Sequence, residues 1–120
     1  MKYELSQKFY FEAAHTLHRE IHAEGSRRIH GHTYHCEIAL HGVPDPSSGM
    51  LTDLAFVRKE IERVRDMLDH RFLDDVKNLG PATLENLCTF LLRELRETMP
   101  QLVRVSIERP ASGDRCSLSL

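Results

Sequence analysis

The sequence predicts an α+β domain in which two helices cover one face of a four-stranded antiparallel sheet. Three observations support this prediction. Two N-terminal segments alternate apolar and polar side chains, as strands with one solvated face do. Two central segments repeat apolar residues every three or four positions, which is the period of a helix. Two shorter alternating segments follow, so the predicted order is strand, strand, helix, helix, strand, strand.

The first two strands enclose a long connection. The first is expected from Tyr3 to His15, and His15 lies on its apolar side near the end. Residues 16–29 are polar and of mixed charge, and we expect a long loop, which in a compact domain is often functional. The second strand runs from about His32 to His41, and His30 joins its apolar face if the extended backbone reaches back by two residues.

Two helices and two further strands complete the prediction. Asp53 and Thr83 can each accept a backbone N–H at the start of a helix. Antiparallel sheets can bury one face, and two amphipathic helices can cover it. The expected segments are helical stripes from about residue 54 to 68 and from 84 to 95, strands near 103–107 and 116–120, and turns at 42–49 and 111–114.

The composition fits one domain of residues 1–120 and argues against several functions. A net charge of −2 gives no electrostatic reason to expect nucleic-acid binding. No apolar run approaches the ~20 residues that cross a membrane, and the charged N-terminal segment is unlike a signal peptide. The three cysteines are far apart and odd in number, which indicates reduced thiols in a cytoplasmic protein.

Three histidines are expected to converge on the apolar faces of the first two strands. His30 and His32 project from the same face of a strand, roughly 6.6 Å apart, and His15 can approach from the neighbouring strand end. Catalytic zinc takes three protein ligands and leaves one position open. The alternative is three ordinary hydrogen-bonded histidines, and their shared face favours zinc. Four other histidines are expected to be exposed: His18, His22, His35 and His41.

Five short motifs run in order through nearly the whole chain. They are Phe11-Glu12-Ala13-Ala14-His15, His30-Gly31-His32-Thr33-Tyr34, Leu68-Asp69-His70, Thr83-Leu84-Glu85-Asn86 and Glu108. This series resembles the family of 6-pyruvoyltetrahydropterin synthase and 6-carboxytetrahydropterin synthase. The resemblance implies the tunnelling fold, whose small subunits join their sheets into barrels, usually as a hexamer made of two trimers. It also implies 7,8-dihydroneopterin triphosphate as the substrate.

The resemblance further implies the roles of five residues near a metal ion. His15, His30 and His32 correspond to the zinc ligands of the family. Asp69 and His70 correspond to its acid/base pair, in which a carboxylate fixes the tautomer of an imidazole and raises its basicity. From the sequence alone, that pair also fits the end of a helix, where a protonated histidine is stabilised by the helix dipole.

Four more residues are implied in binding the substrate. Glu108 corresponds to the catalytic glutamate that holds the pterin ring and is coupled to the acid/base relay. Thr83 and Leu84 lie where the family's backbone contacts the pterin. The plain alternatives are a solvated charge for Glu108 and a helix cap for Thr83. Arg27, beside Arg28, can hold a triphosphate, and two exposed loop cations are the equal alternative.

The family's catalytic base is a cysteine four residues before the first histidine of His-Gly-His, and here that position is Ser26. A serine hydroxyl is far less acidic than a thiol and needs a partner base. Three hypotheses follow. Ser26 or a neighbour such as Glu24 still supports proton abstraction with the acid/base pair. Otherwise the chemistry has shifted towards cleavage of the substrate's side chain, or a zinc-binding protein remains without activity.

The sequence therefore predicts a zinc-dependent pterin enzyme. The minimal chain length looks like the bacterial 6-carboxytetrahydropterin synthase of queuosine biosynthesis, which converts dihydroneopterin triphosphate to carboxytetrahydropterin and releases acetaldehyde and triphosphate. The alternatives are a 6-pyruvoyltetrahydropterin synthase, which eliminates triphosphate and keeps the side chain, and a non-catalytic zinc- or pterin-binding module.

Overall fold

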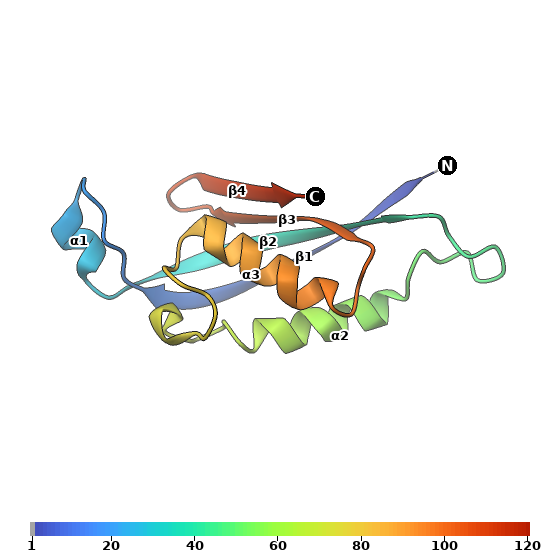
Figure 1. Ribbon diagram of the computed structural model, residues 1–120, viewed down its shortest axis with the longest axis horizontal. Coiled ribbons are helices and arrows are strands. Elements are labelled where there is room, and N and C mark those ends of the chain that lie inside the picture. The colour runs from blue at the N-terminus through green and yellow to red at the C-terminus, as the bar shows by residue number, and fades with distance from the viewer. Residues whose placement is uncertain (1) are drawn as a thin grey trace.

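The structure, a computed structural model that describes residues 2–120, has the predicted element order with two short helical additions (Figure 1). The four strands form one antiparallel sheet in the order β1-β2-β3-β4. The elements are β1 (Tyr3–His15), α1 (Ala23–Arg27), β2 (His30–Gly42), α2 (Leu54–Arg65), the 3-10 helix η1 (Leu73–Asp75), α3 (Leu84–Arg96), β3 (Leu102–Arg109) and β4 (Asp114–Ser119).

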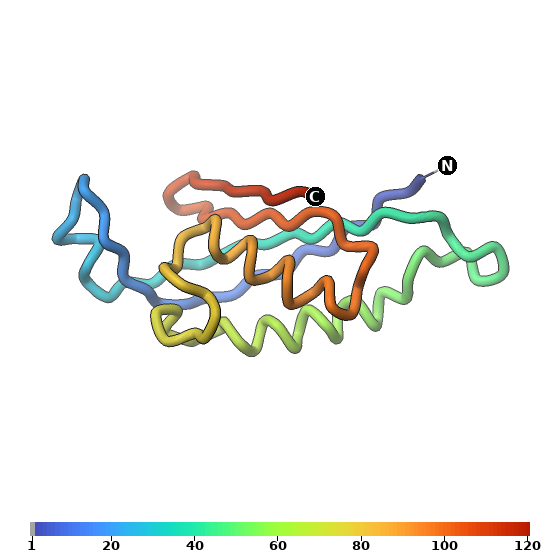
Figure 2. Tube along the Cα trace, viewed as in Figure 1, coloured from blue at the N-terminus to red at the C-terminus, as the bar shows by residue number. Residues whose placement is uncertain are grey.

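Both long helices lie on one side of the sheet. α3 packs against β3 and β4, and α2 packs against β1 and α3 (Figure 1). The molecule is elongated, with extents of 57 × 23 × 22 Å. The loop that carries α1 extends beyond the sheet at one end, and the turn after β2 extends at the other (Figure 2). None of the helices within residues 2–120 is long and apolar enough to span a membrane.

The pairing of β1 with β2 decides which side chains share a face. It runs without a shift from Tyr3 opposite Gly42 to His15 opposite His30. β2 therefore begins at His30, two residues before the start at His32 that the alternation alone predicted. Because side chains alternate along a strand, His15, His30 and His32 project on the same side of the sheet.

The core lies between this face of the sheet and the two helices. Phe11 and Tyr34 stack with ring centroids 4.8 Å apart, and both side chains are fully buried. Leu87 and Leu91 of α3 cover them from the helical layer and are also fully buried. The opposite face of the sheet carries polar side chains and is not covered by any described element.

The predicted caps are confirmed. Asp53 Oδ1 accepts a hydrogen bond from the N–H of Ala55 at 2.8 Å, and Thr83 Oγ1 accepts one from Asn86 at 3.1 Å. These bonds satisfy backbone donors that have no partner within the helix.

Two details of the prediction were wrong. The first long helix ends at Arg65, and Leu68 follows in a turn that still places its side chain in the core. The loop over 16–29 is not wholly irregular, because it contains the five-residue α1. Such a short helix has no periodic pattern to detect, and its turn depends on the left-handed backbone of His22 (φ 56°) and on the Ser26 side chain.

Replacing Leu87 by Ala should lower the free energy of unfolding by about 2–5 kcal/mol, because the change leaves a cavity in a fully buried position. Ile21→Ala is the matched control, since Ile21 is 77% exposed and should change stability by less than about 0.5 kcal/mol. Urea unfolding followed by circular dichroism measures both. Equal effects would contradict the described core.

Candidate functional site

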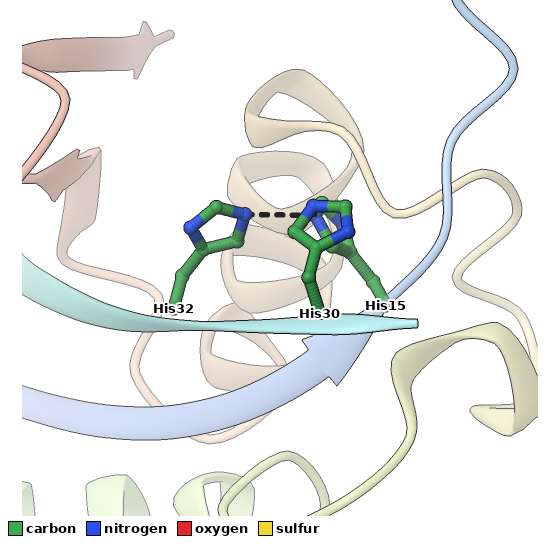
Figure 3. A group of neighbouring side chains, drawn as sticks. All are labelled: His15, His30 and His32. Atoms are coloured by element: carbon green, nitrogen blue, oxygen red, sulfur yellow. Dashed lines mark hydrogen bonds between the residues drawn. The ribbon is translucent and has the colours of Figure 1, made fainter. Parts of the chain in front are cut away.

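Three imidazole rings meet at the end of the sheet, where β1 finishes and β2 begins. Figure 3 shows them rising from the same side of the two strands. His15 Nε2 lies 3.0 Å from His30 Nε2 and 3.0 Å from His32 Nε2. One ligand atom from each residue lies within 4.8 Å of the others. The three histidines predicted to converge are therefore brought together, with their nitrogens aimed at one point.

Backbone carbonyls fix the orientation of two of these rings. His15 Nδ1 lies 2.9 Å from the carbonyl oxygen of Ala82, and His30 Nδ1 lies 2.8 Å from that of Arg28. A carbonyl oxygen can only accept, so each Nδ1 donates its hydrogen, and each neutral ring keeps a lone pair on Nε2. Two lone pairs facing each other at 3.0 Å repel unless a cation lies between them. The residues therefore fit a bound metal ion.

Burial favours the neutral form of two of the rings, those of His15 and His32, and the neutral form is the one that binds a metal. Burial lowers the pKa of His32 to about 4, and the charges of His15 and Arg109 act in the same direction. Burial also lowers the pKa of His15, although its bond to the Ala82 carbonyl opposes that effect. At neutral pH the lone pairs of His15 and His32 are available.

The acid/base pair predicted from the sequence is also formed. Asp69 Oδ2 accepts from His70 Nδ1 at 2.8 Å, and Asp69 Oδ1 accepts from the N–H of Glu12 at 3.0 Å. The backbone N–H of His70 donates to the carbonyl of Glu12 at 2.6 Å, which ties the pair to the edge of β1. His70 has a left-handed backbone (φ 58°), and its side chain is 76% exposed, so its Nε2 faces outwards.

One cavity lies beside the pair, on the sheet face away from the three imidazole rings. Its volume is about 530 Å³, and its lining residues are Glu12, Ala13, Ala14, Gly31, His32, Thr33, His70, Arg71 and Phe72. Glu12 and Thr33 are paired opposite each other, and their side chains project away from the face that carries the histidine rings. Within one chain, this cavity therefore holds His70 without joining it to the three convergent imidazoles.

Glu108 does not join this group within one chain. It lies opposite His35 in the β2–β3 pairing, on the sheet face away from the three histidines. Its Oε2 is 3.7 Å from Arg115 Nη1, and it lines a separate cavity with Lys8 and His35. Any shared role for Glu108 and the metal cluster would require a second subunit.

Two of the other residues implied in substrate binding, Thr83 and Leu84, lie near the histidines, because they directly follow Ala82, whose carbonyl accepts from His15. Thr83 and Leu84 line a cavity of about 590 Å³ on the helical side of the sheet, together with Arg19. Arg27 is exposed on α1, and the neighbouring Arg28 forms an exposed ion pair with Glu24 at 3.2 Å.

Ser26 is used to hold the loop together. Its side chain is buried, its Oγ donates to the carbonyl of Ala23 at 2.8 Å, and it accepts from the N–H of Arg19 at 3.1 Å. The hydroxyl donor is therefore occupied by a backbone carbonyl, and no side-chain base accepts from it. Ser26 therefore lacks the activation that a serine would need to act as a base or nucleophile.

The remaining histidines differ in exposure. His18, His22 and His35 are exposed, as expected. The expectation for His41 was wrong, because it is half-buried and its Nε2 lies 2.8 Å from Glu4 Oε1.

The sequence reasoning missed one buried charge. Arg109 is only 8% exposed and follows Val105 and Ile107 on the core face of β3. The sequence does contain a signal for this residue. Arg109 continues the alternation of Val105 and Ile107, which predicts that its side chain lies on the core face, where a charge needs a partner.

Changing His30 to Ala should reduce bound zinc from one ion per chain to a small fraction, because two imidazoles cannot complete the site. His35→Ala is the control, since His35 lies on the same strand but faces the other side. Metal analysis after dialysis measures both variants. Full zinc retention in the His30 variant would contradict the ligand set.

Asp69→Asn should destabilise the metal-free protein by about 1–2 kcal/mol at neutral pH, since a charged acceptor is lost. The N–H of Glu12 holds the pKa of Asp69 below its usual range against the effect of burial, with further help from His70 and Arg65. The stabilisation of the fold by ionised Asp69 is therefore complete above about pH 5 and is lost as the pH falls below about 4. Urea unfolding from pH 7 to pH 3 tests this, and a pH-independent difference would contradict it.

Comparison with known proteins agrees with this fold. Residues 4–118 match the family profile described as 6-pyruvoyl tetrahydropterin synthase. A relative from Caenorhabditis elegans is 36% identical over 114 residues, covering 82% of this chain and 81% of the relative. The solved structure of C. elegans 6-pyruvoyl tetrahydropterin synthase gives a TM-score of 0.85 at 29% identity, covering 100% of this chain and 96% of that one.

Two other relatives have different described activities. A 6-carboxy-5,6,7,8-tetrahydropterin synthase from Synechocystis is 30% identical over 108 residues, covering 84% of this chain and 81% of the relative. A dihydroneopterin monophosphate aldolase from Pyrococcus furiosus is 28% identical over 105 residues, covering 88% of this chain and 85% of the relative. The chain has the tunnelling fold and belongs to the 6-pyruvoyl tetrahydropterin synthase family, whose members are pterin-processing lyases.

Proposed function

We propose that this protein is a zinc-dependent lyase that converts 7,8-dihydroneopterin triphosphate to 6-carboxy-5,6,7,8-tetrahydropterin, with release of acetaldehyde and triphosphate. The observation that carries the proposal is the convergence of His15, His30 and His32, whose nitrogens are aimed at one point in a chain that also holds an oriented imidazole at His70. The Synechocystis relative, described as a 6-carboxy-5,6,7,8-tetrahydropterin synthase, supports the choice of reaction.

The residues divide the work between binding and proton transfer. His15, His30 and His32 would hold the zinc ion, which, when bound, polarises substrate hydroxyls and stabilises enolate-like charge. Asp69 accepts from His70 Nδ1, so the lone pair on His70 Nε2 is free to take a proton and return it.

A second candidate is favoured by the hydrogen bonds of Ser26. Because its Oγ donates to Ala23, Ser26 is not an activated base, and this candidate assigns proton transfer to His70. Cleavage between the first two side-chain carbons needs one base that takes the proton of the second hydroxyl. The second carbon then becomes the aldehyde carbon, and the electron pair of the broken carbon–carbon bond moves into the pterin ring system. The proton is returned to the first carbon. The P. furiosus relative, described as a dihydroneopterin monophosphate aldolase, supports this alternative.

The proposal includes assembly into a hexamer built as a dimer of trimers. Glu108 lies on the sheet face away from the histidines, so a site that uses both would have to combine residues of neighbouring subunits. The uncovered polar face and the edges of the four-stranded sheet are consistent with joining sheets between subunits. We also propose a cytoplasmic location, which fits three free cysteines, and no nucleic-acid partner, which fits the net charge of −2.

The products distinguish the candidate functions. Zinc-loaded protein is given 7,8-dihydroneopterin triphosphate, and pterins and aldehydes are followed by chromatography. Acetaldehyde with the carboxy product is expected. A hydroxymethyl pterin with a phosphorylated two-carbon aldehyde would establish the second candidate, and triphosphate release with a retained side chain would establish a 6-pyruvoyltetrahydropterin synthase. Bound zinc and pterin without turnover would leave a binding module and overturn the proposal.

His70→Ala should lower the turnover rate by about 10²–10⁴-fold, the usual contribution of a general acid/base. Zinc content should be unchanged, because His70 is not a ligand. Ser26→Cys is the companion variant. If the thiol keeps the bond to Ala23, the rate should change little. A large gain in rate would show that the loop still positions a base there and would contradict the assignment of proton transfer to His70.

A further inference from the structure

A second cavity adjoins the metal cluster on its far side from His70. Its volume is about 240 Å³, and it lies between the α1 loop and the turn that joins β3 to β4. His30 and His32 form one wall, and Ser26, Arg19 and Arg109 form others. A group bound at the three histidines can therefore extend into this space.

Arg109 is held in this cavity with a donor left over. Its side chain is 10% exposed, and its Nη2 donates to Asp114 Oδ2 at 2.9 Å. Its Nε is buried and has no hydrogen-bond partner among the described residues. A buried donor without a partner is costly, so this Nε favours a place where a polar ligand belongs.

The charge of the cavity is positive. Arg109 and Arg19 both line the cavity together with His30 and His32. The acidic wall is Asp114, which is half-exposed and already accepts from Arg109 and Ser112. An anion in this cavity would face two guanidinium groups and one carboxylate that is already paired.

We propose that Arg109, with Arg19 beside it, binds a phosphate oxygen of the substrate next to the metal-binding histidines and so selects phosphorylated pterins. The inference rests on the proposed function. In a phosphorylated dihydroneopterin, the first and second side-chain carbons carry hydroxyls, and the third carbon carries the phosphate ester oxygen. A substrate whose hydroxyls reach the histidines thus presents its first phosphate to the adjoining cavity.

A guanidinium suits this task because it stays charged and presents its donors in a planar fork that matches phosphate oxygens. The assignment also moves the anion-binding role away from Arg27, which is exposed on α1. The competing explanation is structural. Arg109 also closes the β3–β4 turn, since its carbonyl accepts from the N–H groups of Ser112 and Gly113 and its side chain pairs with Asp114.

Two substitutions separate these explanations because they act in opposite directions. Arg109→Met removes the proposed phosphate donor. Asp114→Asn removes the carboxylate that competes for it. If Arg109 binds phosphate, the first change weakens phosphate binding and the second strengthens it. If Arg109 only closes the turn, both changes lower the melting temperature and neither changes phosphate affinity.

The probe is inorganic tripolyphosphate, titrated calorimetrically into the zinc-loaded protein. Arg109→Met should raise the Kd at least about tenfold, the usual effect of losing a charged hydrogen bond, and Asp114→Asn should lower it. Arg93→Met, an exposed change on α3, is the matched control and should leave the Kd unchanged. Protein-bound zinc is measured before and after each titration, so that chelation of zinc by the probe is not mistaken for binding.

The outcomes also distinguish this inference from the proposed function. An unchanged Kd in both cavity variants overturns the inference, as does turnover by Arg109→Met with an unchanged KM for the phosphorylated substrate. Binding of tripolyphosphate that depends on Arg109, without turnover of any pterin, overturns the proposed function and leaves the inference intact. If Arg109→Met does not fold, the direction of the Asp114→Asn effect decides the question.

Discussion

The uninterrupted pairing of β1 with β2 is the constraint on which the candidate site depends. It places His15 directly opposite His30, with His32 two residues further along the same face. A slip of one residue would turn the β2 histidines towards the opposite face, because side chains alternate along a strand. The register is fixed along the whole length of the pair by the stacked Phe11 and Tyr34 and the core around them. The hydrophobic layer and the metal cluster are thus two results of the same alignment.

Much of this could be predicted from local patterns. Alternation along β1 and β2 predicted which histidines share a face, and the helical stripes and caps predicted both long helices. What could not be predicted depends on contacts between distant segments. The bonds of Ser26 to Ala23 and Arg19 require the folded loop, and the bond of His70 to Glu12 requires the segment after α2 to lie along β1. A family motif predicts which residues are present, but not which of their polar atoms are already occupied.

The site divides into parts with different degrees of completeness. The three convergent histidines and the Asp69–His70 pair each have their orienting bonds within one chain. The residue implied in holding the pterin, Glu108, lies on the other face of the sheet from the histidines. The residues implied in metal binding and in ring recognition are therefore separated by the thickness of a sheet. This separation links activity to assembly, because a subunit with a correct core can still lack a complete site.

The carbonyl oxygens that orient His15 and His30 belong to the backbones of Ala82 and Arg28. Many metal sites assign this task to a carboxylate side chain, which a single substitution can remove. Here the acceptor persists whatever side chain occupies either position, so sequence drift at 28 and 82 can proceed without altering the tautomers of the ligands. The orientation of these two rings depends instead on the path of the backbone. An insertion or deletion before β2 or before α3 would displace an acceptor, and the lengths of these two connections are more constrained than their composition.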